Sequence, residues 1–201
     1  MKKCVRRIGI CCLVAALAWG SLLIKDHQQL RNELIRIHVV ANSDSREDQA
    51  LKLQVRDAVV NSLSAQLRNV ADVQQAKMYI QEKLPRLRQL AEDALRAAGC
   101  EDGVRISLED AFFEKREYDS VSLPAGIYNA LRITIGEGAG QNWWCVAFPV
   151  LWSADSGEEV REITAGAGFP ERLSDTLTEG YTIRFACLDA LGRLENMLFP
   201  G

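Results

Sequence analysis

The sequence predicts an α+β protein, with an N-terminal signal or anchor helix followed by a single domain in which amphipathic helices pack on a largely antiparallel sheet. Three observations predict this class. An uninterrupted apolar run follows a basic N-terminus, two long segments repeat apolar residues at helical spacing, and a block of short, partly alternating segments precedes a last helical pattern. Strands that follow one another along the chain favour antiparallel pairing, so one largely antiparallel sheet is expected. The amphipathic helices should bury their apolar sides against it.

The N-terminal segment has the pattern of an export signal or a membrane anchor. Residues Met1–Arg7 carry four positive charges and no acid, and an apolar run from Ile8 to Ile24 follows. A helix over this run would be about 26 Å long, slightly short of a hydrocarbon core of about 30 Å. Because the basic flank stays in the cytoplasm, the rest of the chain is expected across a membrane. We therefore divide the chain into a signal peptide or membrane anchor, residues 1–25, and an exported domain, residues 26–201.

Removal of this segment after export is left open by the sequence. Ala18 and Gly20 supply small residues before Ser21, as a signal peptidase requires, but the pair is not ideal. Two cysteines within the apolar run would suit a lipoprotein, yet the bulky Ile10 stands where a small residue should precede the lipidated cysteine. Lipidation is therefore not predicted.

The charge and cysteine content of the exported part exclude several classes of protein. Residues 1–25 hold five of the 24 basic residues and none of the 27 acidic ones, which leaves the exported part with a formal charge of −8. Nucleic acid binding needs clustered basic residues and is not predicted. Cys100, Cys145 and Cys187 are an odd number without a CxxC spacing, so we expect neither a disulfide scaffold nor a structural metal.

The exported part begins with a predicted strand and helix. Leu34–Val40 is rich in β-branched residues and places Arg36 and His38 on one face, as in a strand. Asp44, with Glu47 three residues later, predicts the capped start of a helix.

The remaining elements follow from periodicity and turn residues. Helical spacing predicts a helix ending near Leu67 and a second one from Val73 to Ala98, which Pro85 should kink or divide and Gly99 should end. Leu151–Tyr181, rich in Gly, Glu and Ser, is predicted to be a mobile excursion. Strands are predicted at Val104–Glu109, Phe112–Tyr118, Tyr128–Ile135 and Asn142–Phe148, and a closing helix at Ile183–Leu198.

Four groups of residues are candidates for chemistry or binding. The glycines of Gly136–Gly140 suggest a phosphate-binding loop, but a strand follows where a helix N-terminus is needed, so a hairpin loop is the preferred interpretation. Cys145 with His38 would make a nucleophile and its base, although a cysteine in an apolar strand is commonly a buried hydrophobe. A cation could be held by the oxygens of Asn42, Ser43, Asp44, Glu47 and Asp48. They lack the alternation of a calcium loop and already serve to start a helix, so no metal site or cofactor is predicted.

The fourth group is the pair Trp143 and Trp144. Neighbouring strand residues point to opposite faces, so one ring should join the core and the other should be exposed, unless the excursion covers both. An exposed Trp143 beside Glu137, Gln141 and Asn142 would suit a contact with another protein.

Two long motifs resemble the stage II sporulation protein R family. The first is Ile37–Ser45 (IHVVANSDS), continued by Asp48–Leu53 (DQALKL) and Val55–Asp57 (VRD), and the second is Leu123–Gly126 (LPAG) leading to Ile135–Val146 (IGEGAGQNWWCV). The resemblance covers most of the chain from about residue 33 to residue 148. It brings no established catalytic residues with it.

The resemblance implies a signalling protein of endospore-forming bacteria. Such a protein is made in the forespore and exported into the space between the forespore and mother-cell membranes. There it triggers a membrane-embedded aspartic protease of the mother cell, which removes the pro-sequence of the sporulation sigma factor E precursor. The export signal at residues 1–25 agrees with this role.

The leading hypothesis is therefore an activator without enzymatic activity, which binds the extracytoplasmic part of the protease and would stay at the membrane through residues 8–24 if uncleaved. Its predicted contact surface is Glu137, Gln141, Asn142 and Trp143, with Asn42–Asp44 as a second patch. The alternative is an exported Cys-His hydrolase that uses Cys145 and His38. A third class is an envelope scaffold with no instructive role.

Overall fold

The computed structural model describes residues 2–151, 154, 156–178 and 182–198. The helices are α1 (Lys2–Glu33), α2 (Arg46–Leu67), α3 (Val73–Ala97), α4 (Gly157–Gly166), α5 (Glu171–Thr178) and α6 (Ile183–Leu198). The strands are β1 (Ile35–Val40), β2 (Val104–Phe113), β3 (Arg116–Glu117), β4 (Ser122–Leu123), β5 (Gly126–Ile135) and β6 (Asn142–Phe148). The predicted α+β class is confirmed.

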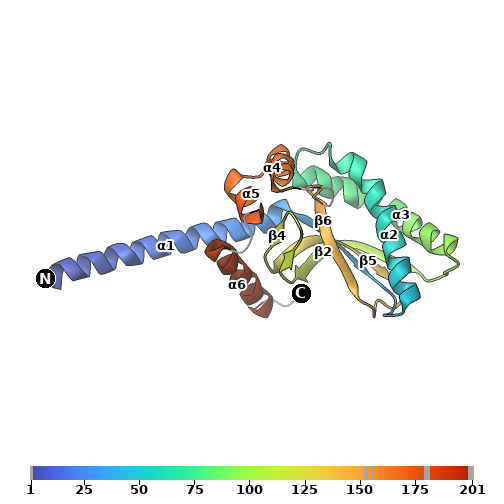
Figure 1. Ribbon diagram of the computed structural model, residues 1–201, viewed down its shortest axis with the longest axis horizontal. Helices are drawn as coiled ribbons and strands as arrows, with labels where there is room; N and C mark the ends of the chain where they lie inside the picture. The colour runs from blue at the N-terminus through green and yellow to red at the C-terminus, as the bar shows by residue number, and fades with distance from the viewer. Residues whose placement is uncertain (1, 152–153, 155, 179–181, 199–201) are drawn as a thin grey trace.

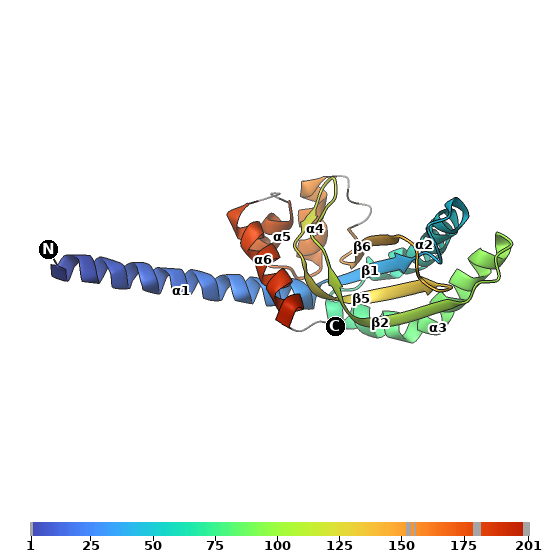
Figure 2. The same cartoon turned by 90° about the horizontal axis from the view of Figure 1, so that it is seen from below.

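A mostly antiparallel sheet forms the centre of the domain, in the strand order β2-β5-β1-β6. β1 pairs parallel with β5 and antiparallel with β6, while β2 pairs antiparallel with β5. β3 and β4 form a separate two-stranded ribbon. The first and last strands of the predicted set therefore meet in space, because β1 lies between β5 and β6 (Figures 1 and 2).

The two faces of the sheet are covered differently. Ile37 pairs with Leu131 and Cys145, and this face carries the fully buried side chains that α2 and α3 cover (Figure 1). Arg36 and His38, the next residues along β1 in either direction, point to the opposite face. That second face is covered at one end by the end of α1, by α6 and by the β3–β4 ribbon.

α3 passes through Pro85 without a break, so of the two expected effects, a kink or a division of the helix, the division does not occur. Proline removes one backbone donor inside a helix and destabilises it. Ile80 and Leu87, on either side of the proline, are almost fully buried against the rest of the core. Their burial in the same core stabilises the two halves of α3 as one continuous helix.

The prediction of a mobile excursion over Leu151–Tyr181 was also wrong, because the described part of this segment contains α4 and α5. The Ser156 hydroxyl caps α4 by accepting a hydrogen bond from the backbone N–H of Glu159 (3.2 Å). Val160 of α4 and Leu173 of α5 are fully buried, and the hydroxyls of Thr164 and Ser174 are hydrogen-bonded across the pair at 2.7 Å. Both helices are so short that their apolar period is hard to recognise in sequence.

α1 extends as one helix from the apolar N-terminal run into the domain, without a break at the predicted boundary between residues 25 and 26. Its large side chains between Ile8 and Ile24 are mostly exposed, and it is long and apolar enough to cross a membrane. Figure 1 shows its N-terminal part projecting from the body. An apolar N-terminal helix of this kind is typical of a signal anchor or export sequence.

The last turns of α1 are tied to the C-terminal helices by ion pairs. Asp26 is 2% exposed and lies 2.9 Å from the Arg172 guanidinium of α5 and 2.5 Å from that of Arg184 of α6. Glu195 of α6 pairs with both His27 and Arg31 of α1. The helix that carries the apolar run is thus held directly on the domain.

We predict that Asp26→Ala lowers the free energy of unfolding by about 1–3 kcal/mol, because it leaves two arginines without their buried anion. The measurement is thermal unfolding of the full chain in detergent micelles, followed by circular dichroism. Asp175→Ala is the matched control: it breaks the exposed pair of Asp175 with Arg161 and should cost less than about 1 kcal/mol. Equal effects of the two changes would contradict the anchoring role of Asp26.

Candidate functional site

The carboxyl end of β1 brings together the two regions predicted as separate contact patches. β5 runs parallel to β1, so the loop that follows β5 begins at the same edge of the sheet as the turn that follows β1. β6 runs antiparallel to β1 and therefore starts at this edge. We call the resulting surface, residues 41–44 and 136–142, the β1 corner; it lies at the end of the body away from the projecting part of α1 (Figure 1).

Backbone N–H groups of the glycine loop bind the turn after β1. The N–H of Glu137 donates to Asn42 Oδ1 at 3.0 Å, and that of Gln141 donates to Asp44 Oδ1 at 2.7 Å. Two backbone bonds of 3.0 Å, from Ala139 to the Asn42 carbonyl and from Gly140 to the Ala41 carbonyl, lie between them. The two predicted patches are therefore one surface.

Glycine is required in this loop because the two backbones approach closely. A Cβ atom on Gly140 would lie 2.2 Å from the Ser43 carbonyl oxygen, and one on Gly136 would lie 2.3 Å from Asn42 Oδ1. Gly136 and Gly138 also have positive φ angles of 54° and 69°, which favour glycine. The loop leads into the strand β6, and its N–H groups bind the protein itself. The prediction of a hairpin loop was wrong, because β1 lies between β5 and β6 and the loop crosses the end of β1 to join them.

The turn after β1 is fixed from its other side by the first turns of α2. Asp48 accepts hydrogen bonds from Asn42 Nδ2 (3.1 Å) and Ser43 Oγ (2.5 Å), and the Ser43 hydroxyl holds the pKa of the Asp48 carboxyl below its usual range, assisted by Asn42. The helix cap is Ser45, whose hydroxyl accepts from the N–H of Asp48 (3.0 Å). The prediction of Asp44 as the cap was wrong, because Asp44 binds Gln141 instead.

Of the predicted contact residues, those of the glycine loop remain available to a partner. The side chains of Glu137, Gln141 and Asn142 are exposed, whereas Asn42 and Ser43 are half-buried and hydrogen-bonded to Asp48. Lys52 of α2 supports the loop from below, since its ammonium donates to the Gln141 carbonyl at 3.1 Å. Asn42 and Ser43 thus hold the loop in position, and the loop carries the exposed side chains that a partner can contact.

Trp143 and Trp144 point to opposite faces of β6, as predicted, since Trp143 pairs with Val39 and Trp144 with His38. The expectation of one core ring and one exposed ring was wrong, because both are half-buried. Each ring is covered by an arginine: the guanidinium carbon of Arg56 lies 5.1 Å from the Trp143 ring centroid, and that of Arg116 lies 3.9 Å from the Trp144 ring centroid.

Cys145 and His38, the predicted nucleophile and base, lie on opposite faces of the sheet. Cys145 pairs with Ile37, whereas His38 is the next residue of β1 and faces the other way. Burial raises the pKa of the Cys145 thiol, which is the opposite of what activates a nucleophile. The His38 ring stacks on Trp144 at 5.7 Å between centroids and meets the edge of Phe113 at 5.9 Å.

Metal-ligating side chains do not gather in the described part of the chain, where no group of three or more His, Cys, Asp or Glu residues is placed to hold an ion. Cys100, Cys145 and Cys187 are all free thiols.

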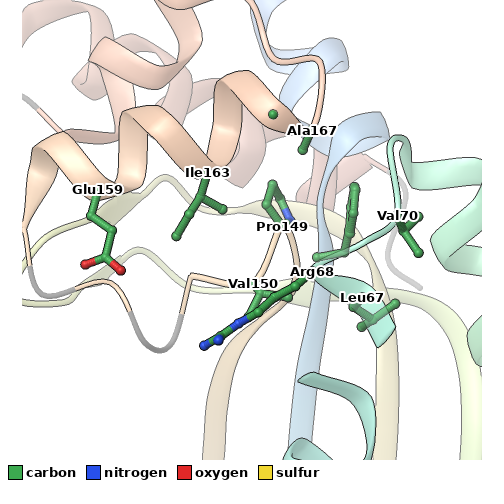
Figure 3. Close-up of a pocket in the computed structure, with 10 residues that line it drawn as sticks. Leu67, Arg68, Val70, Pro149, Val150, Glu159, Ile163 and Ala167 are labelled. Carbon is green, nitrogen blue, oxygen red and sulfur yellow. The ribbon is translucent and has the colours of Figure 1, made fainter. Parts of the chain in front are cut away.

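A hollow of about 380 Å³ lies far from the β1 corner, between the end of α2 and α4. Figure 3 shows Leu67, Val70, Pro149 and Ile163 around it, with Arg68 and Glu159 at its sides. It lies near the C-terminus of α2, whereas the corner lies at the N-terminus of that helix, about 30 Å away. Its lining is mainly apolar and brings together no nucleophile with a base.

Comparisons with known proteins give a consistent result. A family model described as Stage II sporulation protein R (spore_II_R) matches residues 31–158, which include all four strands of the sheet and the whole β1 corner. Stage II sporulation protein R of Bacillus subtilis (strain 168) is 34% identical over 175 residues, which cover 81% of this chain and 77% of that protein. No solved structure matches the chain.

We predict that Gly140→Ala destabilises the protein by about 1–3 kcal/mol, because its Cβ atom would collide with the Ser43 backbone. Gly103→Ala is the control, since a Cβ atom there meets nothing within 4 Å. Thermal unfolding of both full-length variants measures the difference. A Gly140→Ala protein as stable as the control would show that the loop does not need this close approach.

The stability of the domain should fall as the pH drops below about 6.5, the ordinary pKa of a histidine, because His38 is half-buried. Burial lowers the pKa of His38, with Arg132 and Arg36 acting in the same direction, while a hydrogen bond with Asn142 and the charge of Glu109 oppose it. The unfolded chain, with an ordinary histidine pKa of about 6.5, therefore takes up its proton first, and stability is lost as pH falls below that value. His38→Gln should flatten the dependence of the melting temperature on pH between about 5 and 7. An unchanged slope would contradict this assignment.

Proposed function

The chain belongs to the stage II sporulation protein R family, and on this basis we propose that it is an exported signal that activates a membrane-embedded aspartic protease of the mother cell during endospore formation. Activation leads to proteolytic maturation of the sporulation sigma factor E precursor. The protein acts from the space between the forespore and mother-cell membranes, either released or held at the forespore membrane by residues 8–24.

The orientation of the molecule supports this proposal. The apolar part of α1 projects from one end of the body and the β1 corner lies toward the other (Figure 1). A single residue separates the end of α1 from the start of β1. The six residues of β1 then span about 20 Å before the corner begins. A domain anchored through α1 would therefore present the corner away from its own membrane and toward the opposite one.

The exposed side chains of the corner supply the contact surface. Glu137, Gln141 and Asn142 are carried on a loop that Asn42, Asp44 and Lys52 hold in place by hydrogen bonds. A surface ordered before binding loses little entropy when a partner docks. The activator shifts the protease to its active state because it binds that state more tightly.

A role as a binder is also favoured over the Cys-His hydrolase. The sheet separates Cys145 from His38, and the raised pKa of the thiol keeps it protonated at neutral pH. An envelope scaffold would be needed in proportion to its abundance and would not act as a timed trigger.

The test is an immunoblot of sigma factor E precursor processing in a sporulating strain that lacks the gene and carries wild type or a variant. Wild type and Cys145→Ser should restore processing equally, because a nearly isosteric change spares a binding surface. Trp143→Ala should reduce processing at least tenfold, since it removes the ring that Arg56 stacks on, directly after the exposed residues Gln141 and Asn142. Tyr79→Ala, which truncates a half-buried aromatic of α3, is the matched control and should process normally.

Each variant is first checked for export and accumulation. If a folded, exported Cys145→Ser protein fails to signal, the hydrolase takes the place of the activator. If wild type itself fails to restore processing, the protein is not the signal.

A further inference from the structure

The two edges of the central sheet differ in how well they are protected against pairing with another strand. β2, at one edge, carries Arg105, Glu109 and Asp110 among its ten residues. β6, at the other edge, carries no charged residue and no proline among its seven. Charged side chains and proline are the usual means of preventing an edge strand from pairing. β6 is therefore the edge whose sequence permits an added strand.

A trough runs along the outer side of β6. One hollow of about 570 Å³ is lined by Arg116, Glu117 and Tyr118 on one side and by Gln141–Trp144 on the other. A second hollow of about 300 Å³ continues it toward the turn after Tyr118. The two share Tyr118, Trp143 and Trp144, so they adjoin each other beside the strand.

The backbone of β6 offers hydrogen-bonding groups to this trough. Alternate residues of an edge strand turn their N–H and C=O groups away from the sheet. Over the described residues, the one hydrogen bond that reaches the backbone of Asn142–Cys145 from outside the sheet comes from the Tyr118 hydroxyl, which donates to the Trp144 carbonyl at 3.1 Å. Because the Trp144 carbonyl points away from the sheet, alternation places the Trp144 N–H and the N–H and C=O of Asn142 on the same outer side.

The opposite wall of the trough is held in position from the core. Arg36 is fully buried, with its guanidinium carbon 4.2 Å from the Phe113 ring centroid, and it donates a hydrogen bond to the Tyr118 hydroxyl at 3.3 Å. Tyr118 thereby connects the central strand to the β3–β4 ribbon. The trough is thus bounded by two fixed walls and does not need to be ordered by its occupant.

Arg116 gives the trough a positive charge next to the strand. It stacks on Trp144, and no ion pair to it is found within the described part of the chain, whereas Arg56, on the other tryptophan, pairs with Asp57 at 2.7 Å. A stacked guanidinium keeps its hydrogen-bond donors free for a carboxylate.

We propose that the outer edge of β6 over Asn142–Cys145 binds an extended peptide segment of the partner protein as an added β-strand, with an acidic side chain of that segment on Arg116. Main-chain hydrogen bonds supply affinity in this mode and side chains at alternate positions supply specificity. The inference rests on the proposed function, because it assigns a mode of binding to the same partner. It extends the contact from the corner along the adjoining outer edge of β6.

The test uses the full chain in sporulating cells, with a photo-crosslinking phenylalanine analogue introduced at one position at a time. Glu117 lies across the trough from β6, Ala139 is exposed at the tip of the corner, and Arg105 is exposed on the unpaired side of β2. Glu117 should crosslink to the extracytoplasmic part of the membrane protease, and Arg105 should not. Crosslinking from Ala139 without Glu117 would place the partner on the corner tip and overturn the added strand while leaving the proposed function intact.

A second arm uses charge reversal. Arg116→Glu should weaken crosslinking from Ala139 or Glu117 at least tenfold, and Arg105→Glu, with the same change of charge on the protected edge, should leave it unaltered. Equal effects of the two reversals would overturn the role of Arg116. A crosslink from Glu117 to a second copy of this chain would identify the added strand as an edge-to-edge dimer and overturn the partner assignment. Absence of any crosslink in cells that process the sigma factor normally would overturn the trough as the binding site and leave the proposed function intact.

Discussion

The close approach of Gly140 to the backbone of Ser43 is the constraint on which the surface of this protein depends. It requires the turn after β1 and the loop before β6 to lie against each other, with room for hydrogen atoms but not for a Cβ atom. Four hydrogen bonds from the loop N–H groups follow from that contact and give the loop a single conformation. Of the residues that we assign to partner binding, Glu137, Gln141 and Asn142 are carried on this loop or follow it directly, whereas Arg116 belongs to β3.

The central position of β1 explains why distant motifs meet. β1 pairs parallel with β5 and antiparallel with β6. The end of β5 and the start of β6 therefore both lie at the carboxyl end of β1. The same strand carries Arg36 into the core, where aromatic rings and the Tyr118 hydroxyl surround it in place of a carboxylate. Burial lowers the pKa of this guanidinium, and the two neighbouring tyrosines, Tyr118 and Tyr128, oppose that effect. One strand thus organises both the corner and the wall of the trough.

The attachment of α1 fixes the direction of the apolar N-terminal run relative to the domain. A flexible linker between the apolar run and the domain would leave the orientation of the corner unspecified. Here the helix continues into the body, and buried Asp26 binds arginines from two separate C-terminal helices. The C-terminal helices α5 and α6 lie outside the region matched by the family model, yet they supply the partners of α1. In this structure their ion pairs join the end of α1 to the domain.

The sequence alone determined the class of the fold, most of its elements and the family, because apolar periodicity, β-branched runs and two long motifs are local properties. Asn42 and Glu137 were each identified as candidates, but the hydrogen bond between them was not predictable, since it depends on β1 lying between β5 and β6. The helices α4 and α5 were missed because each has only two large apolar residues, Val160 and Ile163 in α4 and Leu173 and Leu177 in α5, and only burial against the body makes them evident. The separation of Cys145 from His38 was decided by strand register, in which a shift of one residue exchanges the faces of the sheet. The trough beside β6 likewise exists only in the tertiary structure, because its two walls come from strands that are far apart along the chain.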